Sequence, residues 1–157
     1  MLISAQSGDV TQSYVPSKET NLSEITIIEI RQGYVEYSIH LPISGTQYRV
    51  GSRTVLRIRS DRSITDGQCH TIHIARSQKR ATLITDHHMV SGEFQDTYLN
   101  YNPNNVVFFG GLAINNTGFP SDYQNFTGCV GDVFVNEHSV QLLTTASELR
   151  GPVEPCQ

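Results

Sequence analysis

The sequence lacks the features that mark several large classes of protein. It contains no run of about 20 apolar residues, the length that a membrane-spanning helix needs. Its first ten residues, MLISAQSGDV, have neither the basic segment nor the apolar stretch of a signal peptide. It also has no amphipathic helical pattern, no internal repeat and no G-x-S-x-G, phosphate-loop or metalloprotease-helix motif. We therefore expect no membrane insertion, and no sequence motif indicates an enzyme.

The composition that remains indicates one globular domain. The 157 residues are 38% hydrophobic and 17% charged, which suits a single folded domain and argues against disorder. The net charge of −4 argues against nucleic acid as a partner. The charge is unevenly distributed, because eight of the eleven Lys and Arg lie between residues 49 and 80, beside only two acids.

Short stretches rich in β-branched and aromatic residues predict strands along the whole chain. Residues 34–41 alternate in polarity, so we expect Val35, Tyr37 and Ile39 on a buried face and Glu36 on a solvent face. Residues 25–30 pair with them as a hairpin. Further strands are expected at 2–5, 55–59, 71–76, 81–85, 106–109 and 133–135, and residues 86–104 are expected to be mostly loop. Many short, closely spaced strands predict an all-β fold, an antiparallel β-sandwich.

The chain has three cysteines, so a disulfide between two of them leaves the third as a free thiol. Cys69 leads into the strand of Ile72 and is expected to be a buried free thiol that acts as a small apolar side chain. A catalytic Cys69–His70 pair is disfavoured, because adjacent strand residues point to opposite faces. Cys129 precedes a strand and Cys156 lies near the terminus. A bond between them would stabilise the fold by roughly 3–4 kcal/mol in the chain-entropy description.

Four motifs, in chain order from about residue 24 to 156, resemble those of a laminin G-like domain, most like a module from a laminin α chain. They are Asp66-Gly67-Gln68-Cys69-His70 with Thr71-Ile72-His73-Ile74, Ala81-Thr82-Leu83-Ile84-Thr85-Asp86, Phe108-Phe109-Gly110-Gly111-Leu112, and Phe126-Thr127-Gly128-Cys129-Val130-Gly131-Asp132-Val133. The resemblance implies one domain over residues 1–157 with a jelly-roll, concanavalin-like sandwich and a Cys129–Cys156 disulfide. In that family Trp usually stands at the place of Cys69, and two more strands precede the stretch that Leu2-Ile3-Ser4 resembles. We therefore expect the domain to be incomplete at its N-terminus.

The resemblance also implies a Ca²⁺ site at the rim of the sandwich. The ligand positions of the family match the side chains of Glu24 and Asn102 and backbone carbonyls near Leu41 and Asn100. Oxygen ligands on loops suit Ca²⁺, although Glu24 stands where the family usually has Asp. The alternative is an exposed Glu24 and a turn-forming Asn102 before Pro103.

The basic stretch suggests a second site. Arg57 and Arg59 alternate outward on one strand, and Arg76, Lys79 and Arg80 follow. Guanidinium groups suit bidentate contacts with sulfate and carboxylate, so these residues are candidates for binding sulfated or acidic glycans. The alternative is a solvated sheet face without a ligand.

Other polar positions give weaker signals. Asn21, Asn115 and Asn125 head Asn-x-Ser/Thr sequons, which are either glycosylation sites of a secreted chain or chance matches. His87-His88 lacks a third ligand at a fixed spacing, so we expect loop histidines and no transition-metal site.

The function that these features indicate is binding without catalysis. Some sandwiches are glycosidases with two carboxylates on one face; Glu29 and Glu36 can meet across the first hairpin, but no third feature supports that activity. We expect a secreted adhesion module of the extracellular matrix, part of a longer basement-membrane or cell-adhesion chain. Its partners would be cell-surface glycans, glycoprotein receptors or other matrix proteins. The alternatives are a neurexin-like receptor ectodomain module and a purely structural spacer.

Overall fold

The protein is described here from a computed structural model, which describes residues 2–4, 25–42, 52–77, 79–93, 110 and 126–144. All the regular elements among these residues are strands, as predicted from their composition and alternation. They are β1 (Leu2–Ser4), β2 (Ile25–Arg31), β3 (Tyr34–Pro42), β4 (Ser52–Ser63), β5 (Cys69–Ser77), β6 (Arg80–Thr85), β7 (His88–Glu93), β8 (Cys129–Gly131), β9 (Val133–Val135) and β10 (His138–Val140). In this part of the chain, no helix is long and apolar enough to cross a membrane.

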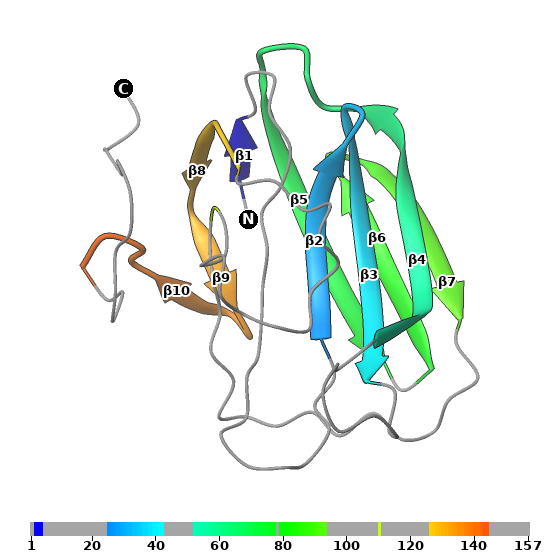
Figure 1. Cartoon of the computed structure of the whole chain (residues 1–157). Coiled ribbons are helices and arrows are strands. Elements are labelled where there is room, and N and C mark those ends of the chain that lie inside the picture. Colours follow the sequence, from blue (N-terminus) through cyan, green and yellow to red (C-terminus); the bar gives the residue numbers. More distant parts are fainter. Residues whose placement is uncertain are drawn as a thin grey trace.

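The strands form two stacked sheets and a small hairpin (Figure 1). One sheet has the order β7-β6-β5-β1-β8, the other has the order β2-β3-β4, and β9 pairs with β10. Every pairing among the described strands is antiparallel. The predicted antiparallel β-sandwich is therefore confirmed.

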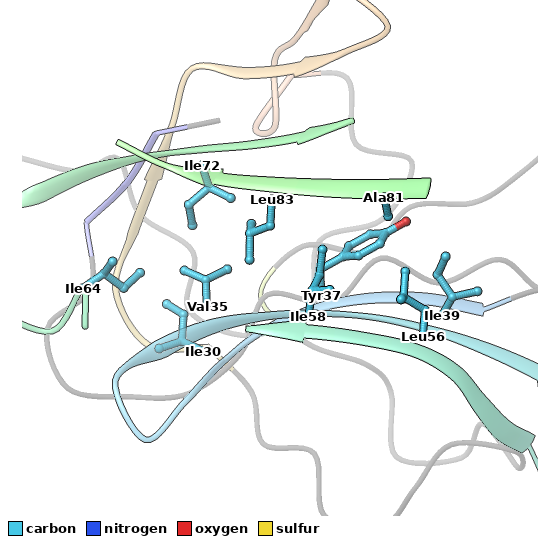
Figure 2. Close-up of a cluster of buried hydrophobic side chains, with 10 residues drawn as sticks. All are labelled: Ile30, Val35, Tyr37, Ile39, Leu56, Ile58, Ile64, Ile72, Ala81 and Leu83. Carbon is cyan, nitrogen blue, oxygen red and sulfur yellow. The ribbon is translucent and has the colours of Figure 1, made fainter. Parts of the chain in front are cut away.

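The core fills the space between the two sheets. Figure 2 shows Ile72, Ala81 and Leu83 of the larger sheet facing side chains from β2, β3 and β4. Val35 and Ile39, on β3, are 0% exposed, as the alternation of that strand predicted. The buried apolar area between the layers supplies the main stabilising term of such a fold.

The first hairpin is closed by a turn that needs glycine. Gln32 and Gly33 have φ values of 53° and 85°, the left-handed pair that a two-residue hairpin turn of type I′ requires. A Cβ on Gly33 would also lie 2.7 Å from Ser63 Oγ. The Gly33 carbonyl accepts a hydrogen bond of 2.7 Å from the Ile64 amide, so the turn is fixed against the end of β4.

β4 is longer than predicted, because a serine side chain supplies hydrogen bonds where the pairing of β4 with β3 becomes irregular. The register of β3 with β4 shifts between Tyr34 and Glu36. Ser60 Oγ accepts a hydrogen bond of 3.0 Å from the Val35 amide and donates one of 2.8 Å to the Arg62 carbonyl. The hydroxyl thus replaces a missing backbone partner, a possibility that a polarity pattern does not reveal.

Three expectations from the sequence are wrong. Residues 86–104 were expected to be mostly loop, but within 86–93, the part that the structure describes, a two-residue turn at Asp86 and His87 leads directly into β7, which pairs with β6. Cys69 is exposed, because its buried neighbour His70 takes the inward position of β5. The polar side of β3 is not a solvent face, since Glu36, Ser38 and His40 are 4%, 0% and 2% exposed.

The apolar stretch 133–135 is only partly buried. Val133 is in the core, but Phe134 is 55% exposed and Val135 is 39% exposed. Asp132, with a φ of 45°, separates β8 from β9, and β9 then pairs only with β10 among the described strands. The predicted strand at 106–109 lies outside the described residues.

Candidate functional site

A group of charged side chains lies on the outer face of the three-stranded sheet. We call it the carboxylate–arginine cluster, and it consists of Glu29, Arg31, Tyr34, Glu36, Arg57 and Arg59. The register explains why they meet: Glu29 lies opposite Glu36, and Glu36 lies opposite Arg59, whereas their neighbours in sequence point into the core. Directly opposed residues of an antiparallel pair share a face and are close enough to interact.

One buried carboxylate holds two of the arginines of β4, Arg57 and Arg59. Arg57 Nη1 lies 3.5 Å from Glu36 Oε2, and Arg59 Nε lies 3.7 Å from Glu36 Oε1. The side chains of Arg57 and Arg59 are 42% and 40% exposed, against 6% for Glu36. A guanidinium has five N–H donors, so both arginines keep donors that solvent or a ligand can reach.

Arg59 is further held by an aromatic ring and a carbonyl. Its Cζ lies 4.2 Å from the centroid of the Tyr34 ring, a cation–π contact. Its Nη2 donates a hydrogen bond of 3.5 Å to the Arg31 carbonyl. Arg31 in turn donates to Glu29 Oε2 over 3.4 Å. The arginines are therefore positioned before any ligand arrives, which lowers the entropy cost of binding.

The same face continues into a buried histidine. His40 Nε2 lies 2.9 Å from Ser38 Oγ, and His40 Nδ1 lies 3.2 Å from Thr54 Oγ1. Burial lowers the pKa of His40, and the charge of Arg57 lowers it further. Because Nδ1 faces a hydroxyl and not a carboxylate, and Ser38 is fully buried, these residues differ from a Ser-His-Asp triad. Their contacts support the sheet.

The predicted glycan-binding residues do not form one surface. Arg57 and Arg59 lie together, but Arg80 lies on β6 in the other sheet, where it donates a hydrogen bond of 3.0 Å to Ser91 Oγ and lies opposite Glu93. Lys79 is exposed in the turn before β6, and Arg76 is half-buried on β5. These residues are close in sequence, which suggested one surface, but β4 and β5 belong to different layers of the sandwich.

Several predicted positions lie outside the described residues and stay predictions. These are Glu24, Asn100 and Asn102 of the Ca²⁺ site, Cys156 of the disulfide, and the sequon residues Asn21, Asn115 and Asn125. Of their partners, Leu41 lies on β3 opposite Arg53, and Cys129 begins β8. His88, at the start of β7, has its Nδ1 3.3 Å from Asp61 Oδ2. The described residues hold no group of three or more His, Cys, Asp or Glu that is placed to bind a metal.

His70 forms a hydrogen-bond network that the sequence did not reveal. Its Nε2 lies 2.8 Å from Asp66 Oδ1, and its Nδ1 lies 2.9 Å from Asp86 Oδ2. Asp86 Oδ1 also accepts a hydrogen bond of 2.9 Å from the Thr71 amide. The ring therefore ties the loop before β5 to the turn between β6 and β7. The spacing Asp66-x-x-x-His70 was visible, but its partner Asp86 comes from the fold.

The network shifts three pKa values. Burial lowers the pKa of His70, but its hydrogen bonds to Asp86 and Asp66 outweigh this and raise the pKa above 6.5. The Gln68 amide and then His70 lower the pKa of Asp66 below 3.8. Burial opposes the shift of Asp86, yet His70 and the Thr71 amide lower its pKa below 3.8 as well.

These shifts predict a pH window for stability. The raised pKa of His70 stabilises the fold fully below pH 6.5, and this contribution is lost as pH rises through the folded-state value. The lowered pKa values of Asp66 and Asp86 stabilise it above pH 3.8, and that contribution is lost as pH falls through theirs. Urea unfolding should be measured at several pH values for His70→Gln and wild type. The variant should show its largest loss in free energy of unfolding, relative to wild type, between pH 3.8 and pH 6.5. A difference that does not change with pH would contradict the assignment.

The comparisons agree with this architecture. The family model described as the laminin G domain matches residues 14–138, which is most of the chain and includes the carboxylate–arginine cluster and the His70 network. No curated protein matches the chain. Because the matched residues cover well over half of the 157, this chain belongs to the laminin G domain family.

Proposed function

We propose that this laminin G domain binds anionic groups of cell-surface glycans through Arg57 and Arg59. Laminin G domains are in general extracellular, non-catalytic binding modules. What supports the proposal is the geometry of β4, in which a single buried carboxylate and the Tyr34 ring hold two half-exposed guanidinium groups side by side. Sulfate and carboxylate groups match the planar donors of guanidinium.

Charge favours a weak, salt-sensitive interaction. The carboxylate–arginine cluster has three arginines and two glutamates, so its cations exceed its carboxylates by one. Contacts between half-exposed charges contribute about 0.2–1 kcal/mol each and are screened by salt. We therefore expect binding to an extended polyanion with several acidic groups, and little affinity for a single sulfate ion.

A heparin column tests this proposal with a matched control. Arg57→Ala with Arg59→Ala should elute at lower salt than wild type, with about fivefold weaker affinity at low ionic strength if each contact contributes about 0.5 kcal/mol. Lys79→Ala with Arg80→Ala removes the same charge from the other sheet and should elute with wild type. An equal loss in both variants would show that net charge alone is responsible.

A structural spacer is the second candidate. It is favoured by the same ion pairs, because Glu36 already neutralises part of the charge of Arg57 and Arg59. If wild type elutes in the void volume at low salt, the spacer is the better description.

We further propose a secreted matrix protein as the parent chain, a laminin α chain first and a neurexin-like ectodomain second. Ca²⁺ binding at the rim is a separate proposal that rests on the family resemblance.

A further inference from the structure

The strand β4 forms one edge of the smaller sheet. It ends the order β2-β3-β4, and among the strands that the structure describes it pairs with β3 alone. The strand β7 ends the order of the larger sheet, and it lies against β4 at the same side of the sandwich (Figure 1). An open strand edge presents a row of N–H and C=O groups that can pair with another extended chain.

The register shows in which direction the backbone groups of β3 point. The two-residue turn makes Arg31 and Tyr34 a hydrogen-bonded pair, so every second residue from Tyr34 onward points its N–H and C=O toward β2. The residues between them point toward β4. The Val35 amide agrees with this alternation, because it donates a hydrogen bond to Ser60 Oγ on β4.

The same alternation identifies the open groups of β4. Tyr37 lies opposite Ile58, and because the backbone of Tyr37 points toward β4, these two residues form a hydrogen-bonded pair. Arg57 and Arg59, on either side of Ile58, therefore point their N–H and C=O groups away from β3, toward the open edge. In the described part of the chain, no strand pairs with them on that side.

The charged side chains along this edge are mostly cationic. The strand β4 contains four arginines and one aspartate, Asp61, whose Oδ2 lies 3.3 Å from His88 Nδ1 on β7. Arg57 and Arg59 are 42% and 40% exposed, and they share the single carboxylate of Glu36. A second copy of β4 would place arginines beside arginines, and like charges on adjacent strands repel. The edge therefore favours a partner strand with acidic side chains.

We propose that β4 accepts an acidic, extended segment of another protein as an additional antiparallel strand. Two carboxylates separated by one residue lie opposite Arg57 and Arg59 on the outer face, where charge-assisted contacts can form. The residue between them is apolar and lies beside Ile58, which is 8% exposed and faces the core. The segment thus has the pattern acidic–apolar–acidic.

Backbone pairing determines the class of this partner. Arg57 and Arg59 each supply one N–H and one C=O to the added strand, as in other cases in which a peptide extends a sheet. A polysaccharide can contact the guanidinium groups, but it has no alternating row of N–H and C=O groups to match the edge. Strand addition therefore goes beyond the proposed function and does not rest on it.

Amide hydrogen exchange of the protein alone tests whether the edge is open. The amides of Arg57 and Arg59 should exchange at least about tenfold faster than that of Ile58, because an amide without a backbone partner exchanges without local opening. Both should become protected when an acidic peptide binds. Equally slow exchange at all three amides in the free protein would overturn the proposal.

Binding is tested with a synthetic peptide that has a Glu-Val-Glu core flanked by threonines. N-methylation of both glutamates removes the N–H groups that would face β4, and it should weaken binding at least about tenfold. N-methylation of the valine and of the threonine after the second glutamate removes N–H groups that face away, and it should change the affinity by less than about twofold. Both methylated peptides keep the charge of the parent peptide, and fluorescence anisotropy at low salt measures all three affinities.

Two results of this binding experiment would overturn strand addition. If the position of the methyl groups makes no difference, the arginines attract acidic peptides by charge alone. A peptide with a Lys-Val-Lys core should bind at least about tenfold more weakly than the glutamate peptide, and equal binding of the two would contradict the acidic pattern. Heparin enters neither comparison, so a failure of the proposed function is distinguishable from a failure of strand addition.

Discussion

Leu83→Ala should lower the free energy of unfolding by about 2–5 kcal/mol, the usual cost of removing a large side chain from a packed core. Leu83 is 0% exposed and packs in the cluster that joins the two sheets (Figure 2). The loss combines buried apolar area with the cavity that remains, because the two layers cannot close around it fully. The midpoint of urea unfolding, at unchanged slope, measures it.

Ile84→Ala is the matched control, one residue further along β6. Ile84 points to the outer face and is only partly buried, so its truncation removes less buried area and should cost clearly less. Similar losses at both positions would contradict the inward and outward assignment of β6 and with it the sandwich.

Gly92→Ala should also destabilise the domain, by about 1–3 kcal/mol, the range for overpacking a core. A Cβ on Gly92 would lie 2.7 Å from Ile58 Cγ2 and 2.8 Å from Leu56 Cδ1. β7 approaches β4 at this edge of the sandwich, and both contacted side chains are buried, so neither can move away without disturbing its own packing. Thermal unfolding at fixed scan rate provides the comparison.

Gly131→Ala separates this clash from the general effect of replacing glycine. Nothing lies within 4 Å of a Cβ built at Gly131, so alanine there should be neutral or stabilise by about 0.4–1 kcal/mol through the unfolded state. Adding Leu56→Ala to Gly92→Ala should cost less than the sum of the two single changes, because the second change makes room for the first. Additive losses would argue against contact between β4 and β7.

Local pattern was sufficient for the strands whose faces differ in polarity. The alternation of residues 34–41 placed Val35 and Ile39 in the core, and Gln32-Gly33 fixed the hairpin turn. The same pattern was misleading for Glu36 and His40, because alternation shows which side chains are apolar and not whether the polar side is covered. The strand β7 was not predicted, because its inward-facing residue Gly92 has no side chain and so adds no apolar residue to the alternating pattern.

The candidate site depends on register, which sequence spacing alone does not determine. The pairing of Glu29 with Glu36 was foreseen, since a two-residue turn fixes which residues oppose each other. The partnership of Glu36 with Arg57 and Arg59 was not, because it depends on the alignment of β3 with β4, which the sequence spacing does not determine. The separation of Arg80 from Arg57 follows from the assignment of β6 to the other sheet, which is a property of topology.

The most direct test of this account is to observe which arginines a sulfated oligosaccharide perturbs. Heteronuclear NMR of the side-chain Nε–Hε groups, recorded during titration with a heparin fragment at low salt, resolves them individually. We expect the resonances of Arg57 and Arg59 to shift together and saturably, and that of Arg80 to change little. Shifts concentrated at Arg80, or no saturable shift at any arginine, would contradict the assignment of binding to the outer face of β4.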